Sequence, residues 1–322
     1  MEGLRIYFAP LEGVTDAVFR RVHRACFPGV DKYFIPFISP TQHLTMTSRE
    51  QRAVSPAENA GVPAIPQVLT KNPDHFVHMA HLLGDAGFPE INLNLGCPSG
   101  TVTAKGKGAG MLRDVDGLRA FLDIVYTESP IPVSIKTRIG FESLEEWPAL
   151  RDLFSEYPIH ELIIHPRTRT EFYKGQPHRE LCKTFDAFPF PWVHNGDLTT
   201  AAECRAFLGE YPGAAALMLG RGMVTNPALA RELGGGAPLD LKELEAWHER
   251  LFTAYAEAWP ASAVLGHMRE IMDYVMCCFE EPKRVRKALR KARSLEDYRV
   301  ATEALFRDFK FRERPKFNYP FE

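Results

Sequence analysis

The amino-acid sequence predicts an α/β protein, a (β/α)8 TIM barrel followed by a smaller C-terminal helical domain. Eight short β-like runs between residues 5 and 222 each end in polar, Gly or Pro residues. Amphipathic helical stretches alternate with these runs, and few β signals follow residue 236. Strands that alternate with helices indicate parallel β/α units, and eight such units indicate a closed barrel. We therefore expect a catalytic barrel over residues 1–236 and a helical domain over residues 237–322.

The barrel elements can be placed in chain order. The β-like runs are RIYFAP, KYFIPF, AIPQVL, EINLNL, IPVSIKTR, HELIIHP, FPWVHNG and AALMLGRG. Helix candidates cover residues 16–26, 73–85, 115–128, 144–157 and 200–209, with Asp114 and Thr199 as N-caps and Pro73 at the first helical position. The competing fold is a doubly wound open sheet. Its G-x-G-x-x-G fingerprint is absent after the first run, where the turn reads APLEGVTD.

The segment GGGAP at residues 234–238 reads as a linker to the helical domain. Helices are expected at residues 241–258, 263–279 and 283–293. The last, KRVRKALRKAR, carries seven Lys or Arg and no acid. Val285, Ala288, Leu289 and Ala292 form an apolar stripe that would face a partner helix. Its basic face could be merely solvated or could meet an anionic membrane, but the absence of exposed aromatic residues favours contact with nucleic acid.

Composition limits the class of protein. Of the 322 residues, 45% are hydrophobic and 25% charged, as in ordinary globular proteins. No apolar run approaches the roughly 20 residues of a membrane helix, and MEGLRIYFAP lacks a signal-peptide core, so we expect a cytoplasmic protein without membrane contact. The six cysteines form no C-x-x-C pair, which argues against zinc and a disulfide framework. We expect a metal-free monomer whose net charge of -2 leaves any polyanion to a local basic patch.

The stretch INLNLGCPSGTVTAKGKGAG, residues 91–110, is the strongest candidate for a reactive centre. It begins as a strand and then breaks at glycine and proline, so that Cys97 stands at the start of a loop. Lys105 and Lys107 make this loop cationic, and we expect them to lower the Cys97 pKa. The alternative reading is an unreactive cysteine beside a turn.

Polar side chains follow several of the predicted strands. Active groups in barrels project from the C-terminal strand ends, so these side chains should meet at one mouth. They are Gln67, Asn94, Lys136, Arg138, His165, Arg167, Asn195, Asp197 and Arg221.

Glycines in the last two of these strand ends, NGD at 195–197 and GRG at 220–222, predict a phosphate site, because barrel phosphate sites commonly lie after strands seven and eight. Lys136 and His165 could donate to an electron-rich ring whose amide-like edge pairs with Gln67 and Asn94, which suits an isoalloxazine. The predicted cofactor-binding residues are Pro10, Leu11, Gln67, Lys136, His165, Asn195, Gly196, Asp197, Gly220 and Arg221.

Six ordered motifs resemble those of the tRNA-dihydrouridine synthase family. They are APLEGVTD, LNLGCPS, KTRIG, HPRTRTEFYKG, NGDL and LGRGMVTNP, and they cover the barrel nearly end to end. The basic helical tail resembles that family's tRNA-binding domain. The chain departs from the family pattern at Asn92, where Asp is frequent, and at Pro166, where Gly is commoner.

The resemblance implies FMN-dependent reduction of the C5=C6 bond of a tRNA uridine, with NADPH as electron donor. Hydride would reach C6, and Cys97 would supply the proton to C5. The ordinary thiol pKa of about 8.5 leaves Cys97 mostly protonated near neutral pH, and contact of Lys105 and Lys107 with RNA phosphate would offset their lowering of that pKa. The resemblance also places Asn94, Lys136 and Arg138 nearest the uracil edge. Which uridine is reduced is left open.

A uridine must leave its stack to reach the mouth, so cations at the strand ends should hold the surrounding RNA. Tyr173 or Phe172 could stack on a base. The expected RNA contacts are Asn94, Lys105, Arg138, Arg167, Arg169 and Lys174 at the mouth, and Lys283, Arg286, Lys287 and Arg290 on the basic helix. Two other functions stay open at this point: a dihydroorotate or dihydropyrimidine dehydrogenase-like flavin enzyme, and a non-catalytic RNA-binding barrel.

Overall fold

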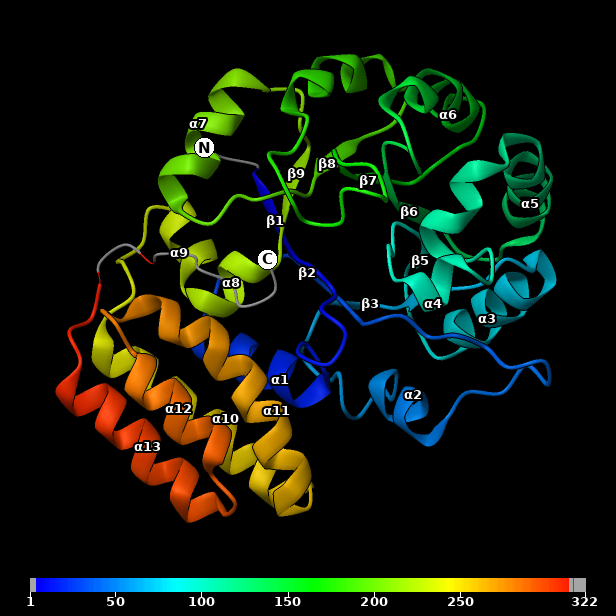
Figure 1. Cartoon of the computed structure of the whole chain (residues 1–322). Coiled ribbons are helices and arrows are strands. Elements are labelled where there is room, and N and C mark those ends of the chain that lie inside the picture. The colour runs from blue at the N-terminus through cyan, green and yellow to red at the C-terminus, as the bar shows by residue number, and fades with distance from the viewer. Residues whose placement is uncertain (1–3, 313–314, 316–322) are drawn as a thin grey trace.

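A computed structural model describes residues 4–312 and 315 and shows a ring of parallel strands surrounded by helices (Figure 1). All eight predicted strand runs are present. The strands are β1 (Arg5–Phe8), β2 (Lys32–Phe34), β3 (Ala64–Ile65), β4 (Gln67–Val68), β5 (Ile91–Leu95), β6 (Val133–Arg138), β7 (Leu162–His165), β8 (Trp192–His194) and β9 (Ala216–Leu219).

One predicted strand, AIPQVL, is split into β3 and β4, and this split accounts for nine strands in an eight-membered barrel. Pro66 lies between the halves and has no N–H to donate to a ladder. β3 pairs with β2, β4 pairs with β5, and every pair in the sheet is parallel. The divided strand therefore closes the ring, and the open doubly wound alternative is wrong.

The helices of the barrel agree with the predicted ranges to within a few residues. They are α1 (Ala17–Cys26), α3 (Pro73–Asp85), α5 (Val115–Glu128), α6 (Trp147–Ser155) and α7 (Ala201–Glu210), with a 3-10 turn η2 (Leu144–Glu146) before α6. Asp114 and Pro73 occupy their predicted capping positions. The N-cap of α7 is Thr200, not the predicted Thr199, because Thr200 accepts the Glu203 N–H while the Thr199 hydroxyl bonds the Glu203 carboxylate.

Several shorter elements were not expected from the sequence. They are α2 (Ser48–Ala53), α4 (Gly100–Thr103), η1 (Gly108–Arg113), η3 (Arg179–Ala187), α8 (Arg221–Thr225) and α9 (Leu229–Leu233). Most of them lie within the connections between strands and helices. Elements this short carry too few residues for a periodic apolar pattern.

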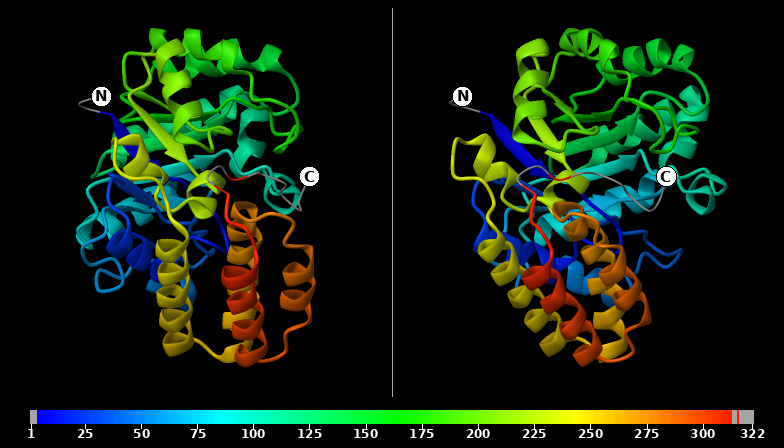
Figure 2. Two further views of the ribbon diagram at one scale, coloured as in Figure 1. Left: turned by 90° about the vertical axis from the view of Figure 1, so that its left-hand side faces the viewer. Right: turned by 60° about the vertical axis from the view of Figure 1, so that its left-hand side comes forward.

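The C-terminal helices form a bundle beside the barrel (Figure 2). They are α10 (Leu241–Ala258), α11 (Ala261–Val275), η4 (Met276–Cys278), α12 (Lys283–Lys291) and α13 (Leu295–Asp308). α10 packs against α1, with the Trp247 ring edge-on to Phe19. On α12, Val285 and Leu289 are buried as predicted, whereas Ala288 is exposed. No helix in the described part of the chain has the length and apolar character needed to cross a bilayer.

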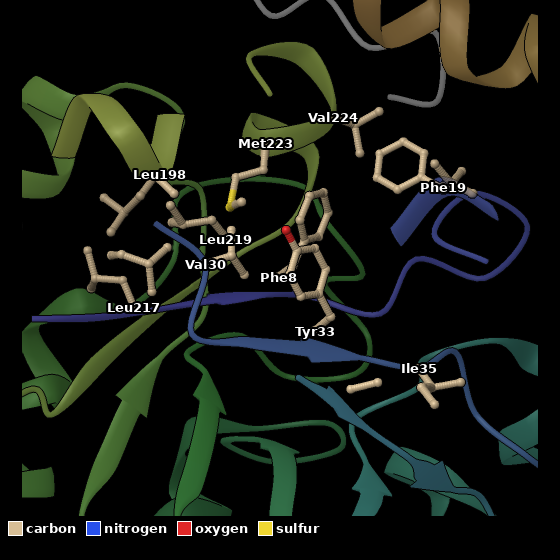
Figure 3. Packing of buried hydrophobic residues seen from close by; sticks show 14 of the residues in the cluster. Phe8, Phe19, Val30, Tyr33, Ile35, Leu198, Leu217, Leu219, Met223 and Val224 are labelled. Atoms are coloured by element: carbon tan, nitrogen blue, oxygen red, sulfur yellow. The ribbon is translucent and has the colours of Figure 1, made fainter. Parts of the chain in front are cut away.

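The outward side chains of β1, β2 and β9 make the core between the barrel and its helices (Figure 3). Phe8 packs against Phe19 of α1 and Tyr33 of β2, with ring centroids 5.6 and 5.7 Å apart. Met223 and Val224 of α8 and Leu219 of β9 belong to the same core. This packing fixes α1 and α8 beside the C-terminal ends of β1 and β9.

The barrel interior has two chemically different halves. Inward residues of β1, β2, β3, β7, β8 and β9 form an apolar cluster that includes Ile163, Val193 and Met218. The inward residues of β4, β5 and β6 are polar, and Gln67, Asn92 and Ser134 are all at most 1% exposed. In a sheet with one face in water, polar residues at alternate positions would face the solvent. In this barrel the inner face is enclosed and the outer face is covered by helices, so these polar residues are buried.

An ion cluster closes the N-terminal end of the interior. Lys32 Nζ lies 2.6 Å from Glu90 Oε2 and 2.8 Å from Glu161 Oε2, and these carboxylates are 3% and 2% exposed. Tyr7 donates its hydroxyl to Glu161 at 2.6 Å, and the half-exposed Arg5 lies 2.7 Å from the same carboxylate. Burial alone would raise the Glu161 pKa, but the bonds from Lys32 and Tyr7 hold it below its ordinary value.

We predict that Lys32→Met lowers the free energy of unfolding by about 3–5 kcal/mol, because it leaves two buried carboxylates with too little positive charge. Urea unfolding at neutral pH measures this loss. Arg5→Met is the matched control and should cost less than about 1 kcal/mol, because Arg5 is half-exposed and Glu161 keeps Lys32. Similar small losses in both variants would contradict the prediction.

Candidate active site

A pocket lies at the C-terminal mouth of the barrel, between the loops that follow β1, β6, β7, β8 and β9. Its empty volume is about 580 Å³. Every predicted cofactor residue except Gln67 contributes to its wall. The lining residues are Ala9, Pro10, Leu11, Lys136, His165, Tyr173, Asn195, Gly196, Asp197, Leu198, Thr199, Met218, Leu219, Gly220, Arg221 and Gly222.

Gln67 does not line this pocket, in contrast to the expectation from its place on a strand. Its side chain lies in the barrel interior, donating to Asn92 Oδ1 and accepting from Asn94 Nδ2, both at 2.7 Å. Gly222 also differs from expectation, because a Cβ there would lie 2.9 Å from Thr199 Cα. That glycine permits close approach of α8 to the neighbouring loop of the chain itself.

The protonation of His165 follows from its neighbour. Arg167 Nη1 lies 3.0 Å from His165 Nε2, and a guanidinium can only donate, so Nε2 is the acceptor. Burial, followed by the charges of Arg138, Lys136 and Arg167, holds the His165 pKa well below its ordinary value. His165 is therefore a neutral imidazole with its proton on Nδ1, a hydrogen-bond donor in the wall of the pocket.

Lys136 is the most strongly perturbed cation of the mouth. Burial and the nearby Arg138 charge lower its pKa to about 7, and the Cys97 thiol acts weakly in the opposite sense. A lysine in this state readily accepts a proton when a negative group arrives.

Asp197 lies between two arginines. Its carboxylate pairs with the fully buried Arg167 and with Arg221 Nη2, the latter at 2.5 Å. Burial would raise the Asp197 pKa, but these two partners hold it below its ordinary value. Asp197 therefore shares its one carboxylate between two guanidinium groups on this side of the pocket.

Cys97 lies just outside the pocket wall, at the start of the loop after β5. Its backbone N–H donates to Asn94 Oδ1 at 2.9 Å, and the residue as a whole is partly exposed. Gly108 packs directly against Cys97. Its φ is +57°, and a Cβ added there would crowd the Cys97 carbonyl oxygen at 3.0 Å. The strand end and the returning loop therefore fix the position of Cys97 from two sides.

Burial raises the Cys97 pKa above its ordinary value. The cations that oppose this effect most are Arg138 and Lys136, not Lys105 and Lys107 as we expected from the sequence. The net result is a thiol that keeps its proton near neutral pH.

Three arginines hold the loops of the mouth together by donating hydrogen bonds to backbone carbonyl oxygens. Arg138, 1% exposed, donates to the carbonyl oxygens of Gly96, Thr168 and Phe172 at 2.8–2.9 Å. Arg169 donates to the Pro98 carbonyl at 3.0 Å. Arg167 similarly donates to the Lys174 and Gly175 carbonyls. Direct RNA contact by these three arginines stays a prediction, to which the structure adds their support of the Cys97 loop.

Exposed lysines stand on the rim of the mouth. Lys105 and Lys174 are exposed, and Lys107 is partly buried with its amine 3.1 Å from Ser39 Oγ. Lys71, which we did not single out, belongs to the same group, because burial and the charges of Lys105 and Lys71 lower the Lys107 pKa. A polyanion near this rim would meet several positive charges.

The basic helix α12 lies beyond α11, which borders the mouth. Tyr274 of α11 is close enough to Arg221 and Tyr173 for their charges to act on its pKa. Lys283, Lys287 and Arg290 of α12 are exposed as expected. Arg286 is instead half-buried, with Nε 3.2 Å from Asp273 Oδ1 of α11. Part of its charge is therefore neutralised within the helical bundle.

Tyr173, which we expected only as a residue that could stack on a base, also lines the pocket. The residue is 46% exposed, and the guanidinium carbons of Arg138 and Arg221 lie 5.3 and 5.2 Å from its ring centroid. It therefore stands between the pocket and the Arg138 side of the mouth. Its place in a loop rather than at a strand end explains why the strand-end rule did not select it for the pocket wall.

Comparison with known proteins gives a consistent picture. A family model described as dihydrouridine synthase matches residues 7–308. The chain is 30% identical over 256 residues to a tRNA-dihydrouridine(16) synthase of Pseudomonas putida, covering 77% of this chain and 79% of that protein. It is 29% identical over 229 residues to tRNA-dihydrouridine synthase B of Pasteurella multocida, covering 70% and 68%.

Solved structures support the barrel fold. Morphinone reductase superposes with a TM-score of 0.51 at 13% identity, covering 73% of this chain and 87% of that one. A structure titled TcOYE with pHBA gives a TM-score of 0.55 at 11% identity, covering 79% and 94%. At these identities the likeness concerns the fold alone.

The lowered Lys136 pKa predicts a pH-dependent stability. Between pH 7 and about 10.4, the ordinary lysine pKa, the unfolded chain binds more protons at this residue than the folded protein. Its contribution should therefore raise the stability of the ligand-free protein with pH, by at most about 1.4 kcal/mol per pH unit.

Denaturant unfolding of the ligand-free protein at pH 7, 8 and 9 measures this contribution as the difference between wild type and Lys136→Met. Lys174→Met removes an exposed lysine and should keep the wild-type slope. Parallel wild-type and Lys136→Met curves would show that Lys136 is not perturbed.

Proposed function

Because the chain belongs to the dihydrouridine synthase family, we propose that it is a tRNA-dihydrouridine synthase, an FMN-dependent enzyme that reduces the C5=C6 bond of a uridine in tRNA. NADPH is the proposed source of electrons. The observation that carries the proposal is the partly exposed, protonated Cys97 beside Lys136, at the edge of a cationic pocket in a barrel mouth. This arrangement brings a proton donor next to a binding place for an anionic cofactor.

The residues that line the pocket suit flavin mononucleotide in their chemistry, because glycine-bearing loops, an arginine and two polar donors surround it. The proposed phosphate-binding part is formed by the loops around Gly196 and Gly220 together with Arg221. Lys136 and His165 Nδ1 are the proposed donors to the ring system. When bound, reduced FMN supplies the hydride that reaches C6 of the uracil.

Cys97 supplies the proton in this proposal. As C6 receives a hydride, the C5=C6 electron pair forms a new C–H bond at C5 with the proton from Cys97 Sγ. The raised pKa keeps that proton available near neutral pH. The thiolate that remains would be stabilised by the positive charges of Arg138 and Lys136 and would regain a proton from solvent, since Cys97 is a partly exposed residue.

The rim and the helical bundle are the proposed contacts to RNA. A uridine that leaves its stack costs a few kcal/mol, which contacts around the mouth must offset. Lys71, Lys105 and Lys174 would meet phosphates, and the exposed Tyr173 ring could stack on a base. Lys283, Lys287 and Arg290 are exposed on α12 and would add further phosphate contacts away from the mouth.

We predict that Cys97→Ala lowers the turnover of tRNA uridine by about 10²–10⁴-fold, because the general acid is lost. Flavin binding should be retained, since Cys97 does not line the pocket. Mass spectrometry of nucleosides from treated tRNA measures the product, and absorbance near the flavin band measures cofactor content. Free uridine as substrate tests for a small-molecule enzyme.

Cys26→Ala is the matched control, because Cys26 is also partly buried but belongs to α1. It should retain wild-type turnover. Full activity of Cys97→Ala on tRNA would remove the proposed acid role, and a protein that turns over free uridine but not tRNA would remove the proposed substrate.

The exposed lysines of α12 should make tRNA binding depend on salt. Replacing Lys283 and Lys287 together by Gln should reduce the slope of log Kd for tRNA against log salt concentration by about 1–2, because each phosphate contact releases roughly one counterion. Filter binding over a salt series measures the slope. The double variant Lys183→Gln, Lys242→Gln removes the same charge from exposed positions elsewhere and should leave the slope unchanged. Equal slopes for both double variants would exclude α12 from the RNA contact.

A further inference from the structure

A chain of hydrogen bonds runs from the Cys97 loop into the barrel. Asn94 Oδ1 accepts the backbone N–H groups of Gly96 at 3.1 Å and Cys97 at 2.9 Å. Because backbone amides can only donate, the orientation of the Asn94 carboxamide is determined. Its Nδ2 then donates to Gln67 Oε1 at 2.7 Å.

The same polarity continues through three more residues. Gln67 Nε2 donates to Asn92 Oδ1 at 2.7 Å, and Asn92 Nδ2 donates to Ser134 Oγ at 2.8 Å. Ser134 donates its proton to Glu90 Oε1 at 2.5 Å. Each carboxamide is used at both ends, so turning any one of them would oppose two donors or two acceptors. We call Asn94, Gln67, Asn92, Ser134 and Glu90 the amide relay.

The relay ends on a fixed anion. Glu90 accepts from Ser134 with one oxygen and lies 2.6 Å from Lys32 Nζ with the other. Lys32 is held in turn by Glu161. The far end of the relay therefore cannot rotate without breaking the ion cluster at the base of the barrel.

Burial of the amide relay costs free energy, because its polar groups lose their contacts with water. The relay residues are between 0% and 7% exposed, and buried polar groups are unfavourable unless every partner is satisfied. The other half of the same interior is filled with Ile163, Val193, Ala216 and Met218. The polar half lies on β4, β5 and β6, and β5 is the strand that leads into the Cys97 loop.

We propose that the amide relay positions Cys97, so that Glu90 and Ser134 control the placement of the thiol through a directed series of hydrogen bonds without touching it. The inference rests on the proposed function only in taking Cys97 as the proton donor. Loss of the Ser134 hydroxyl leaves Asn92 Nδ2 without its acceptor and Glu90 Oε1 without its donor. The relay then loses its anchor at the far end, and the side chains of Asn92, Gln67 and Asn94, with the two backbone N–H groups that Asn94 holds, become less firmly fixed.

The test uses the full-length protein with Ser134→Ala, Glu90→Gln and the double variant. In Glu90→Gln the side chain can keep its oxygen toward Ser134 only by placing its NH2 group against Lys32 Nζ, so the relay loses the charged, fixed acceptor at its far end. Tyr126→Phe is the control. It removes a hydroxyl bond to the Val133 carbonyl, one residue from Ser134 on the same strand but outside the relay.

The first readout is the rate at which iodoacetamide alkylates Cys97, followed by mass spectrometry of its peptide well below the unfolding temperature. We expect both single variants to react several-fold faster than wild type, because the loop is released, and Tyr126→Phe to react at the wild-type rate. Because Ser134→Ala and Glu90→Gln both act through the amide relay, the double variant should be alkylated no faster than the faster of the two single variants.

The second readout separates kcat from KM on tRNA. Misplacement of the thiol should lower kcat roughly ten- to a hundredfold and leave KM for tRNA and the flavin content unchanged. Alkylation rates and kcat equal to those of Tyr126→Phe would overturn the relay, as would multiplicative effects in the double variant. If wild type fails to reduce tRNA, the proposed function fails, while the alkylation rates still decide whether the relay positions Cys97.

Discussion

The hydrogen bond from the Cys97 backbone N–H to Asn94 Oδ1 is the contact on which the rest of the mouth depends. It joins the end of β5 to the loop that carries the thiol, and it determines which way the Asn94 carboxamide faces. Arg138 and Gly108 fix the same loop from other sides, through the Gly96 carbonyl and through close packing against Cys97. The loop that carries Cys97 is thereby held in position from several sides.

Burial decides what each charged group in the mouth can do. Lys136 is left with a pKa of about 7 and His165 is kept neutral, so both can respond to a ligand that brings negative charge. Arg138 and Arg167 are equally buried, but their donors serve backbone carbonyls and Asp197. The charges available to a large polyanion are the exposed ones, on the rim and along α12.

The β/α periodicity was sufficient to predict the eight-membered barrel, and the strand-end rule selected most of the pocket wall, because both depend on local pattern. Gln67 and Arg286 bond to partners that no local pattern reveals: Asn92 and Asn94 for Gln67, and Asp273 for Arg286. The expectation that the Cys97 thiol keeps its proton near neutral pH agrees with its raised pKa, but the cations that act on it are Arg138 and Lys136, not Lys105 and Lys107. The helix α13 was missed although its signal was present, since Ser294 and Asp297 form a capping box ahead of buried Tyr298 and Leu305.

The central claim is that this barrel mouth reduces uridine in tRNA. The most direct test is nucleoside mapping of tRNA from cells that lack the protein, from cells with it restored, and from cells that carry Cys97→Ser. The account predicts that dihydrouridine is missing from a defined tRNA position in cells that lack the protein and in cells that carry Cys97→Ser. It should be present at that position in cells with the protein restored. Unchanged dihydrouridine at every position in cells without the protein would contradict it.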